Sequence, residues 1–279
     1  MTFPWLKGHG TENDFVLLPD HDGSVHGDLD ASFVAALCDR RRGIGADGVL
    51  RVIRSESIGL PSAGEWFMDY RNADGSVSEM CGNGIRVFAL HLVQDGLADP
   101  AAPFVVGTRD GDKIISFRRA RGAGAGDEIS VDMGVPQVQG VTKVSADGNT
   151  WEAQDVRTGN PHAVAFVDRL DDAGSLLTPP EHDESVYPEG VNVEFVVREG
   201  ERHVAMRVHE RGSGETRSCG TGACAVAVAT AVADGAERPV TYRVDVPGGT
   251  VHVTWDTDDH ITLTGPAELV ARGTMDWTA

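Results

Sequence analysis

The feature that most constrains this sequence is an internal repeat built around two cysteines. Residues 81–84 read Cys-Gly-Asn-Gly, and residues 219–222 read Cys-Gly-Thr-Gly. Met68 and Met206 lie at the same distance before their cysteines, and an apolar, helix-like pattern follows each motif. The two copies are separated by about half of the chain. A duplicated unit that gives two similar domains is the simplest explanation.

Two further correspondences extend the repeat. Asn72 and Glu210 are placed alike before the two cysteines. A weaker echo joins residues 10–16, Gly-Thr-Glu-Asn-Asp-Phe-Val, to residues 158–164, Thr-Gly-Asn-Pro-His-Ala-Val, because each has an asparagine shortly after a Gly and Thr pair. We therefore expect each half to present one Cys-Gly-x-Gly motif within a similar fold.

The expected secondary structure is rich in strands. Short β-branched runs at 104–106, 113–117 and 191–197 predict strands. The clearest helices follow the cysteines: residues 85–93 form a one-sided apolar stripe, whereas residues 223–233 are small and apolar on nearly every face. The second helix is therefore expected to be buried.

We place the domain boundary just after the glycine-rich stretch 121–126. This predicts an N-terminal domain over residues 1–127 and a C-terminal domain over residues 128–266. Residues 269–271 resemble a strand, and we expect the segment 267–279 to complete the first domain by pairing with its sheet.

Composition excludes several classes of partner. The 24 Lys and Arg residues are outnumbered by 43 Asp and Glu, which gives a formal net charge of -19. Nucleic acid and anionic membranes are therefore not expected as partners. No stretch approaches the roughly 20 apolar residues of a membrane span, and the first residues lack a basic segment followed by an apolar one. We expect a cytoplasmic protein.

Two of the four cysteines are expected to serve packing rather than chemistry. In the reducing cytoplasm all four should be thiols. Cys38 ends an apolar helical run, and Cys224 lies within the second apolar helix, beyond its first turn. A small buried thiol is ordinary core material in both places.

A cysteine directly before a helix can act as a base. The unpaired N–H groups and the dipole at a helix N-terminus favour negative charge, which predicts a lowered thiol pKa at Cys81 and Cys219. The adjacent glycines let backbone N–H groups approach a bound carboxylate. Two such motifs on opposite sides of one carbon could invert its configuration, one as thiolate base and the other as thiol acid.

Other interpretations of these motifs are weaker. A lone Cys-Gly-x-Gly favours a turn with a buried thiol, but two copies favour chemistry. Cys219 and Cys224 do not have redox Cys-x-x-Cys spacing, and no His or Cys pair has zinc-finger spacing. Residues 43–48 match Gly-x-Gly-x-x-Gly but follow a helical run and precede a strand, the reverse of the dinucleotide-binding order.

With these residues in view, the sequence closely resembles the diaminopimelate epimerase family. The matching motifs follow the family's order from residue 10 to about residue 250 and comprise residues 10–15, 42–48, 72–76, 81–86, 159–162, 192, 210–212, 218–223 and 247–249. The resemblance implies conversion of LL-2,6-diaminoheptanedioate to the meso isomer in lysine and peptidoglycan-precursor synthesis, without pyridoxal phosphate or metal. It also implies an α/β fold of the α+β type, with two pseudo-symmetric domains that each wrap a mixed or antiparallel β-sheet around a central helix.

The resemblance also implies roles for individual residues. Cys81 and Cys219 are the expected catalytic pair. Backbone N–H groups would hold the reacting carboxylate, and Glu210 would receive the adjacent ammonium. The residues for the carboxylate are Gly82, Asn83, Gly220 and Thr221, and those for the rest of the substrate are Asn13, Asn72, Asn160, Asn192 and Arg211. His162 either assists proton transfer or braces a loop.

One departure from the family pattern is visible at Gly48. Some family members carry Gln there, with a side chain that helps to line the substrate site, so the resemblance implies that this contact is lost. Backbone, a water or a neighbouring side chain could replace it.

Two other functions remain open from the sequence. A proline or hydroxyproline racemase would also use two cysteines, but its compact ring substrate would not need Arg211 and four asparagines. A non-catalytic amino-acid-binding protein on the same scaffold would not need both cysteines. The sequence leaves the oligomeric state open, a homodimer included, as well as which cysteine is the base in each direction.

Overall fold

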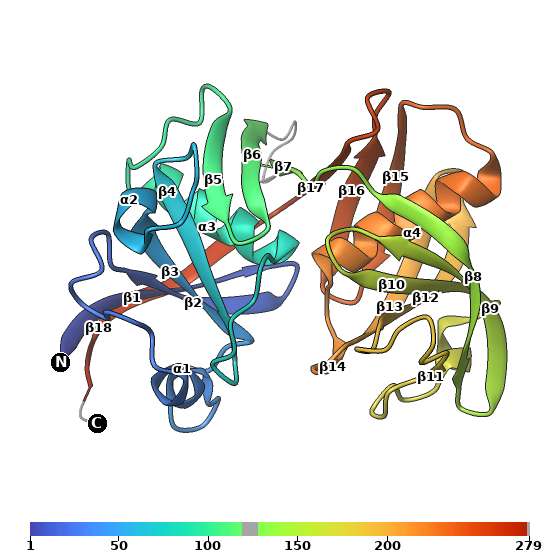
Figure 1. The fold of residues 1–279 in the computed structure, drawn as a ribbon, viewed down its shortest axis with the longest axis horizontal. Helices are drawn as coiled ribbons and strands as arrows, with labels where there is room; N and C mark the ends of the chain where they lie inside the picture. The colour runs from blue at the N-terminus through green and yellow to red at the C-terminus, as the bar shows by residue number, and fades with distance from the viewer. Residues whose placement is uncertain (119–127, 278–279) are drawn as a thin grey trace. The chain divides into compact units, whose positions relative to one another are not determined.

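A computed structural model describes residues 1–118 and 128–277. The chain forms two compact units, one comprising Met1–Val131 with Pro266–Ala279 and the other Asp132–Gly265 (Figure 1). The glycine-rich stretch 121–126, after which the sequence placed the boundary, lies outside the described residues, as does residue 127. No helix in the described ranges is both long and apolar enough to cross a membrane.

The first unit is a mixed sheet with a central helix. In spatial order its strands are β18 (Glu268–Asp276), β1 (Thr2–Gly10), β2 (Asn13–Pro19), β3 (Gly48–Arg54), β4 (Trp66–Asn72), β5 (Phe104–Thr108), β6 (Gly111–Arg118) and β7 (Glu128–Asp132). Its helices are α1 (Ala31–Cys38), α2 (Ser55–Ile58) and α3 (Gly82–Gln94). The β2–β3 and β4–β5 pairs are parallel, and the others are antiparallel.

The second unit repeats this order of pairing. Its principal strands are β8 (Gln137–Ala146), β9 (Asn149–Arg157), β10 (Pro161–Phe166), β12 (Asn192–Gly200), β13 (His203–Glu210), β15 (Val240–Val246), β16 (Gly249–Trp255) and β17 (Ile261–Gly265). The parallel pairs are β10–β12 and β13–β15, at the same places in the order. The short strands β11 (Glu181–His182) and β14 (Gly214–Thr216), a 3₁₀ turn (Leu170–Ala173) and helix α4 (Gly220–Asp234) complete it. The expected α+β class, dominated by sheet with few helices, is confirmed.

Helices α3 and α4 are the cores of their units. α4 contacts β9, β10, β12, β13, β15, β16 and β17, and it is buried from Gly222 to Ala231, as expected from its small apolar residues. The one-sided stripe expected for 85–93 is wrong, because Arg86 and Val87 of α3 are buried as well. Arg86 can be buried because its guanidinium donates to the carbonyl oxygens of Gly82 and Pro266 at 3.0 and 3.3 Å.

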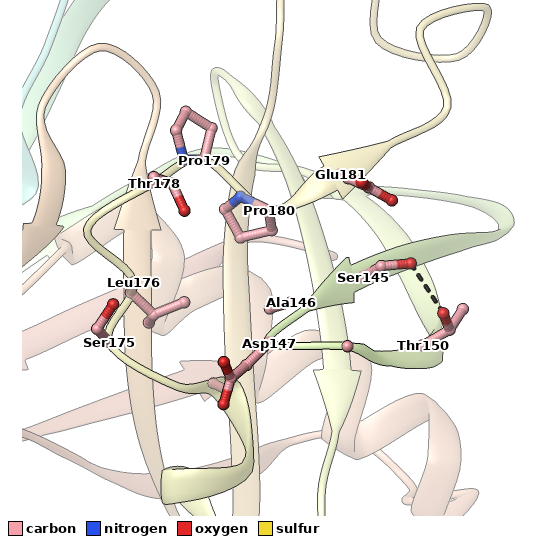
Figure 2. Close-up of a pocket in the computed structure, with 12 residues that line it drawn as sticks. Ser145, Ala146, Asp147, Thr150, Ser175, Leu176, Thr178, Pro179, Pro180 and Glu181 are labelled. Atoms are coloured by element: carbon pink, nitrogen blue, oxygen red, sulfur yellow. Dashed lines mark hydrogen bonds between the residues drawn. The ribbon is translucent and has the colours of Figure 1, made fainter.

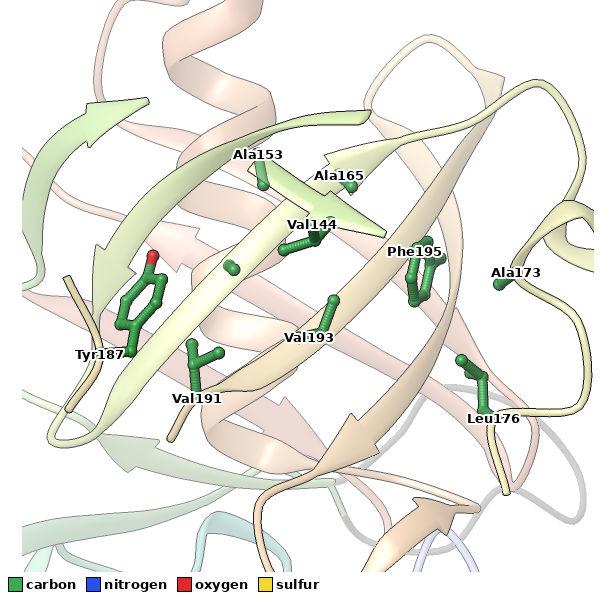
Figure 3. Packing of buried hydrophobic residues seen from close by; sticks show 10 residues of the cluster. Val144, Ala153, Ala165, Ala173, Leu176, Tyr187, Val191, Val193 and Phe195 are labelled. Atoms are coloured by element: carbon green, nitrogen blue, oxygen red, sulfur yellow. The ribbon is translucent and has the colours of Figure 1, made fainter. Parts of the chain in front are cut away.

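The opposite face of each sheet carries a second layer of apolar packing. In the first unit this layer joins α1 to β2 and β3 and includes Cys38, which is 5% exposed. Burial raises the pKa of the Cys38 thiol to about 11, which makes it an inert core residue. In the second unit the layer includes Val144, Val193, Phe195 and Tyr187 (Figure 3). Each sheet is thus covered on both faces, which fixes its register.

Candidate active site

Cys81 and Cys219 are the N-cap residues of α3 and α4. Both have extended backbone conformations, and each sulfur accepts a hydrogen bond from the backbone N–H of the second glycine of its motif. The donors are Gly84 and Gly222, each 3.4 Å from its Sγ. A sulfur therefore takes the place that Ser, Thr, Asp or Asn usually occupies, at the positive end of the helix dipole.

Steric room explains the second glycine of the C-terminal motif. A Cβ atom at Gly222 would lie 2.7 Å from Oε1 of Glu194 and 3.3 Å from the sulfur of Cys219. At Gly84 it would lie 3.2 Å from Leu50 and 3.4 Å from the Cβ atom of Cys81, which is less crowded. Glycine is thus required more strictly in the second motif than in the first.

The surroundings of Cys81 include two of the predicted asparagines. Asn13 Oδ1 lies 3.7 Å from the sulfur and accepts a hydrogen bond from Asn83 Nδ2 at 3.2 Å. The amide of Asn13 donates to Asp47 Oδ2 at 2.8 Å, and Arg40 in turn binds Asp47. This chain of contacts fixes the Asn13 amide with its oxygen toward the cysteine. Asp47 belongs to the matching motif of residues 42–48, but its contact with Asn13 was not predicted from the sequence.

A tight turn places Asn13 beside α3. Strands β1 and β2 pair up to Gly10 and Asn13, so only Thr11 and Glu12 form the loop. Both have positive φ, 49° and 62°, as a type I′ hairpin requires. This conformation is unfavourable for a β-branched residue such as Thr11, so the packing against α3 must hold it. A Cβ atom at Gly10 would lie 2.9 Å from the Asn83 carbonyl oxygen, which shows how closely the hairpin approaches the helix.

Asn72 and Gly48 lie opposite each other in the β3–β4 pair. The Asn72 amide donates to Ser76 Oγ at 2.9 Å, within the turn that follows β4. A Cβ atom at Gly48 would lie 2.6 Å from the Arg71 carbonyl oxygen and 2.7 Å from the Tyr70 ring. The Tyr70 ring and the backbone therefore occupy the space into which a side chain at Gly48 would begin to extend.

Cys219 has a more buried and more acidic environment. The residue is 7% exposed, and its sulfur lies 3.5 Å from Thr221 Oγ1. Burial raises the pKa of the Cys219 thiol well above its ordinary value, and the carboxylates of Glu210 and Glu194 raise it further. The lowered pKa expected for Cys219 from the helix N-terminus is therefore wrong. The hydrogen bonds from Thr221 and Gly222 oppose the shift but are smaller effects.

His162 is fully buried, and both of its ring nitrogens have protein partners. Nδ1 lies 2.7 Å from Glu194 Oε1, and Nε2 lies 2.8 Å from Asn160 Oδ1. The histidine therefore braces Asn160 against Glu194. Sequence reasoning missed Glu194, although alternation along β12 places it on the same face as Asn192, two residues earlier.

Asn192 organises the turn that carries Arg211. Its Nδ2 donates to the Pro161 carbonyl at 3.1 Å, and its Oδ1 accepts from the backbone N–H of Arg211 at 2.9 Å. The Arg211 guanidinium donates to the Glu189 carbonyl at 3.3 Å. Glu210, immediately before, accepts a hydrogen bond from Thr216 Oγ1 at 2.5 Å, and sequence reasoning gave Thr216 no role.

The predicted residues thus fall into groups joined by direct contacts. One group, in the first unit, comprises Cys81, Asn13 and Asn83. The groups of the second unit comprise Cys219 with Thr221 and Glu210, Asn160 with His162, and Asn192 with Arg211.

A separate polar cavity of about 370 Å³ lies between the β8–β9 turn and residues 173–181 (Figure 2). Asp147, Glu181, Leu176 and Pro180 are among its lining residues. It contains none of the predicted site residues, so its location does not argue against the cysteine motifs as the reactive centres. Among the described residues, no group of three or more His, Cys, Asp or Glu side chains is arranged to hold a metal ion.

Solved structures share the duplicated architecture. A PhzF-family phenazine biosynthesis protein from Bacillus anthracis superposes with a TM-score of 0.72 at 17% identity, covering 99% of this chain and 100% of that one. A hydroxyproline epimerase from Agrobacterium vitis gives 0.68 at 14% identity, covering 98% and 92%. These similarities concern the fold. They place the chain in the class of proteins built from two similar α+β units.

Sequence comparison defines the family within this class. The diaminopimelate epimerase family model matches residues 5–139 and 155–270, and the chain belongs to this family. A diaminopimelate epimerase from Streptomyces coelicolor is 54% identical over 98% of this chain and 95% of that protein. One from Mycolicibacterium smegmatis is 48% identical over 98% and 96%. The predicted resemblance and the assignment to the isomerases are confirmed, whereas the alternative of a proline or hydroxyproline racemase gains no support beyond the fold.

Proposed function

We propose that this chain epimerises LL-2,6-diaminoheptanedioate to the meso isomer, with Cys81 and Cys219 as its two acid–base groups. Relatives named diaminopimelate epimerase, one of them 54% identical over almost the whole chain, support the substrate. The structural observation that carries the chemistry is that both central helices begin with a cysteine whose sulfur accepts a backbone N–H. The two-thiol reaction needs such a group for each face of the carbon.

In the proposed reaction one cysteine acts as thiolate and the other as thiol. The thiolate takes the α-hydrogen as a proton, so an S–H bond forms while the C–H bond breaks. The electron pair of that bond moves into the substrate carboxylate. The other S–H bond then breaks, and its proton forms a new C–H bond on the opposite face. The backbone N–H groups of Gly82, Asn83, Gly220 and Thr221 would stabilise the developing negative charge.

The electrostatics of the second unit support Cys219 as the thiol in the resting protein. Burial and two nearby carboxylates raise its pKa. An ammonium group bound beside Glu210 would neutralise the carboxylate that contributes most to this shift after burial. Substrate binding would then ease release of the Cys219 proton during the reaction.

Recognition of the remainder of the substrate is assigned to neutral amides and one arginine. Asn13, Asn72, Asn160, Asn192 and Arg211 would hold the distal amino-acid end, and Glu210 the ammonium beside the reacting carbon. We assign His162 to bracing, because Asn160 and Glu194 occupy both of its nitrogens.

We also propose where the enzyme acts, which cofactors it needs and its oligomeric state. Family membership supports a cytoplasmic enzyme that needs neither pyridoxal phosphate nor metal. A homodimer is the remaining proposal about partners, and light scattering of the purified chain tests it.

The test of the function uses purified, reduced protein without added cofactor. We expect meso product from LL-diaminopimelate, measured by chiral chromatography, and no racemisation of L-proline. Treatment with a chelator and with a carbonyl-trapping reagent should leave the rate unchanged. Activity on proline alone, or none on LL-diaminopimelate in a cooperatively melting protein, would contradict the proposal.

A further inference from the structure

One hydroxyl group that the proposed mechanism leaves unused lies beside Glu210. Thr216 belongs to β14, the short strand that folds back on β13, where Val208 pairs with Thr216 and Glu210 with Gly214. Because side chains alternate along a strand, Thr216 and Glu210 emerge on the same face of this hairpin. Thr216 Oγ1 reaches Glu210 Oε1 at 2.5 Å.

The direction of this hydrogen bond follows from the chemistry of its partners. An ionised carboxylate can only accept, so the hydroxyl must donate. A donated hydrogen bond stabilises the charged form of the carboxylate. It also occupies one carboxylate oxygen and restricts rotation of the side chain. Both effects are what an ammonium-binding carboxylate needs.

The groups that face Glu210 make such support necessary. Burial raises the pKa of Glu210, and the Glu194 carboxylate acts in the same direction. The hydrogen bonds from Thr216 and Cys219, and the nearby His162, oppose the shift. The Thr216 contact is the largest of these opposing effects.

We propose that Thr216 is a positioning residue whose hydroxyl holds the Glu210 carboxylate in one orientation, ionised, for the ammonium group of the substrate. This inference rests on the proposed function of Glu210. It assigns the hairpin β13–β14 the task of presenting a charged carboxylate at a buried site. Thr216 itself does not contact the reacting atoms.

The test compares variants that separate the hydroxyl from the shape of the side chain. Thr216→Val keeps the shape and removes the donor, Thr216→Ala is a second variant without it, and Thr216→Ser restores it. A matched control is Thr250→Val, because Thr250 Oγ1 also donates to a carboxylate, Oδ1 of Asp245 at 2.6 Å, in the β15–β16 hairpin. Each variant is first shown to melt cooperatively.

We expect Thr216→Val to raise KM for LL-diaminopimelate about tenfold, equivalent to about 1.4 kcal/mol, with a smaller change in kcat. The acid limb of kcat/KM should move to higher pH, because Glu210 then takes up a proton more readily. Thr216→Ser should regain most of the loss, and Thr250→Val should behave as wild type. An unchanged KM and acid limb in both variants that lack the donor, or a Ser variant as impaired as the Val variant, would overturn the proposal.

A second readout does not need turnover. The carboxyl carbon of Glu210 can be titrated by NMR in glutamate-labelled protein and assigned by its absence in Glu210→Gln. We expect its midpoint to lie at higher pH in Thr216→Val than in wild type, and an unmoved midpoint refutes the role of Thr216. If the midpoint moves but wild-type protein does not epimerise the substrate, the proposed function fails, whereas the stabilisation of the ionised Glu210 carboxylate by Thr216 stands.

Discussion

The first turns of α3 and α4 lie in different electrostatic surroundings, although the two units share one order of strand pairing. In the parallel pair β2–β3, Phe15 is opposite Gly48, and in the parallel pair β10–β12, His162 is opposite Asn192. Leu50, two residues after Gly48, lies 3.2 Å from a Cβ placed at Gly84. The residue in the corresponding place beside Gly222 is Glu194.

This comparison shows how a duplicated fold can place two cysteine motifs in unequal surroundings. An apolar pair, Phe15 and Leu50, underlies the Cys81 motif, whereas a buried acid–histidine pair underlies the Cys219 motif. Backbone geometry at the caps is nearly the same, so the difference comes from side chains on the neighbouring strands. The proposed reaction, which needs one base and one acid at the same time, would use such an inequality.

The largest expected effect tests whether both units are needed. Cys81→Ala and Cys219→Ala should each reduce epimerisation by about 10³-fold or more, because each removes an acid–base group. Cys38→Ala and Cys224→Ala should retain most activity, since neither thiol lies at a helix N-terminus. The measurement is the initial rate with LL-diaminopimelate, with melting curves to exclude misfolding. Near-normal turnover in either of the first two variants would refute the two-thiol mechanism.

The second prediction breaks the buried pair of the second unit. His162→Phe introduces the residue found at the corresponding place in the first unit but leaves the Glu194 carboxylate buried without its partner. The free energy of unfolding should fall by about 3 to 5 kcal/mol, measured by urea denaturation.

The double variant provides its control. Adding Glu194→Leu to His162→Phe recreates the apolar pair of the first unit, so much of the stability should return. Activity should remain low, because Asn160 has lost its hydrogen-bond partner. A double variant no more stable than the single one would show that His162→Phe lowers the free energy of unfolding through a steric clash.

The third prediction concerns the raised pKa of the Cys219 thiol and uses the Cys81 thiol for comparison. Glu210→Gln removes the carboxylate that, after burial, contributes most to the raised pKa of Cys219. The pH midpoint for alkylation of Cys219 should therefore fall by about one unit, while that of Cys81 should not move. Alkylation rates at each cysteine, resolved by peptide mapping across pH, provide the measurement. Equal shifts at both cysteines would contradict the assignment.

The smallest expected effect concerns stability in acid. Histidines of the first unit should reduce stability as the pH is lowered, whereas a histidine of the second unit should increase it. Burial lowers the pKa of His26 and His91 in the first unit. Below about pH 6.5 the unfolded chain therefore binds more protons than the folded chain, and the stability of the fold decreases as the pH is lowered. Asp132 raises the pKa of His260 in the second unit, so its contribution is present in acid and is lost as pH rises through the folded pKa. Between pH 7 and 5.5, His91→Leu should reduce the drop in Tm by about 2 to 4 °C. His260→Asn should enlarge the drop slightly, and a reversed order would refute the assignment.

The sequence predicted those parts of the site that short motifs encode. Both cysteine caps followed from Cys-Gly-x-Gly before an apolar run, and the burial of α4 followed from its small residues. Contacts that depend on how distant strands pair were not predictable. Glu194 and Thr216 acquire their roles only through the registers of β10 with β12 and of β13 with β14. The pKa of Cys219 was predicted in the wrong direction, because the helix N-terminus was visible in the sequence, whereas the burial of the thiol and the approach of Glu210 and Glu194 depend on tertiary packing.

The return of the C-terminal strand has a consequence for how the protein is made. The second unit is built from one continuous stretch, Asp132–Gly265, whereas β18 supplies the strand beside β1 in the first unit. In the second unit the equivalent strand, β8, directly precedes β9 in the chain. Every strand of the second unit therefore precedes β18 in the chain, and the first unit keeps an open edge at β1 until β18 has been made. The half of the enzyme that is translated first is the half whose sheet needs the last strand of the chain.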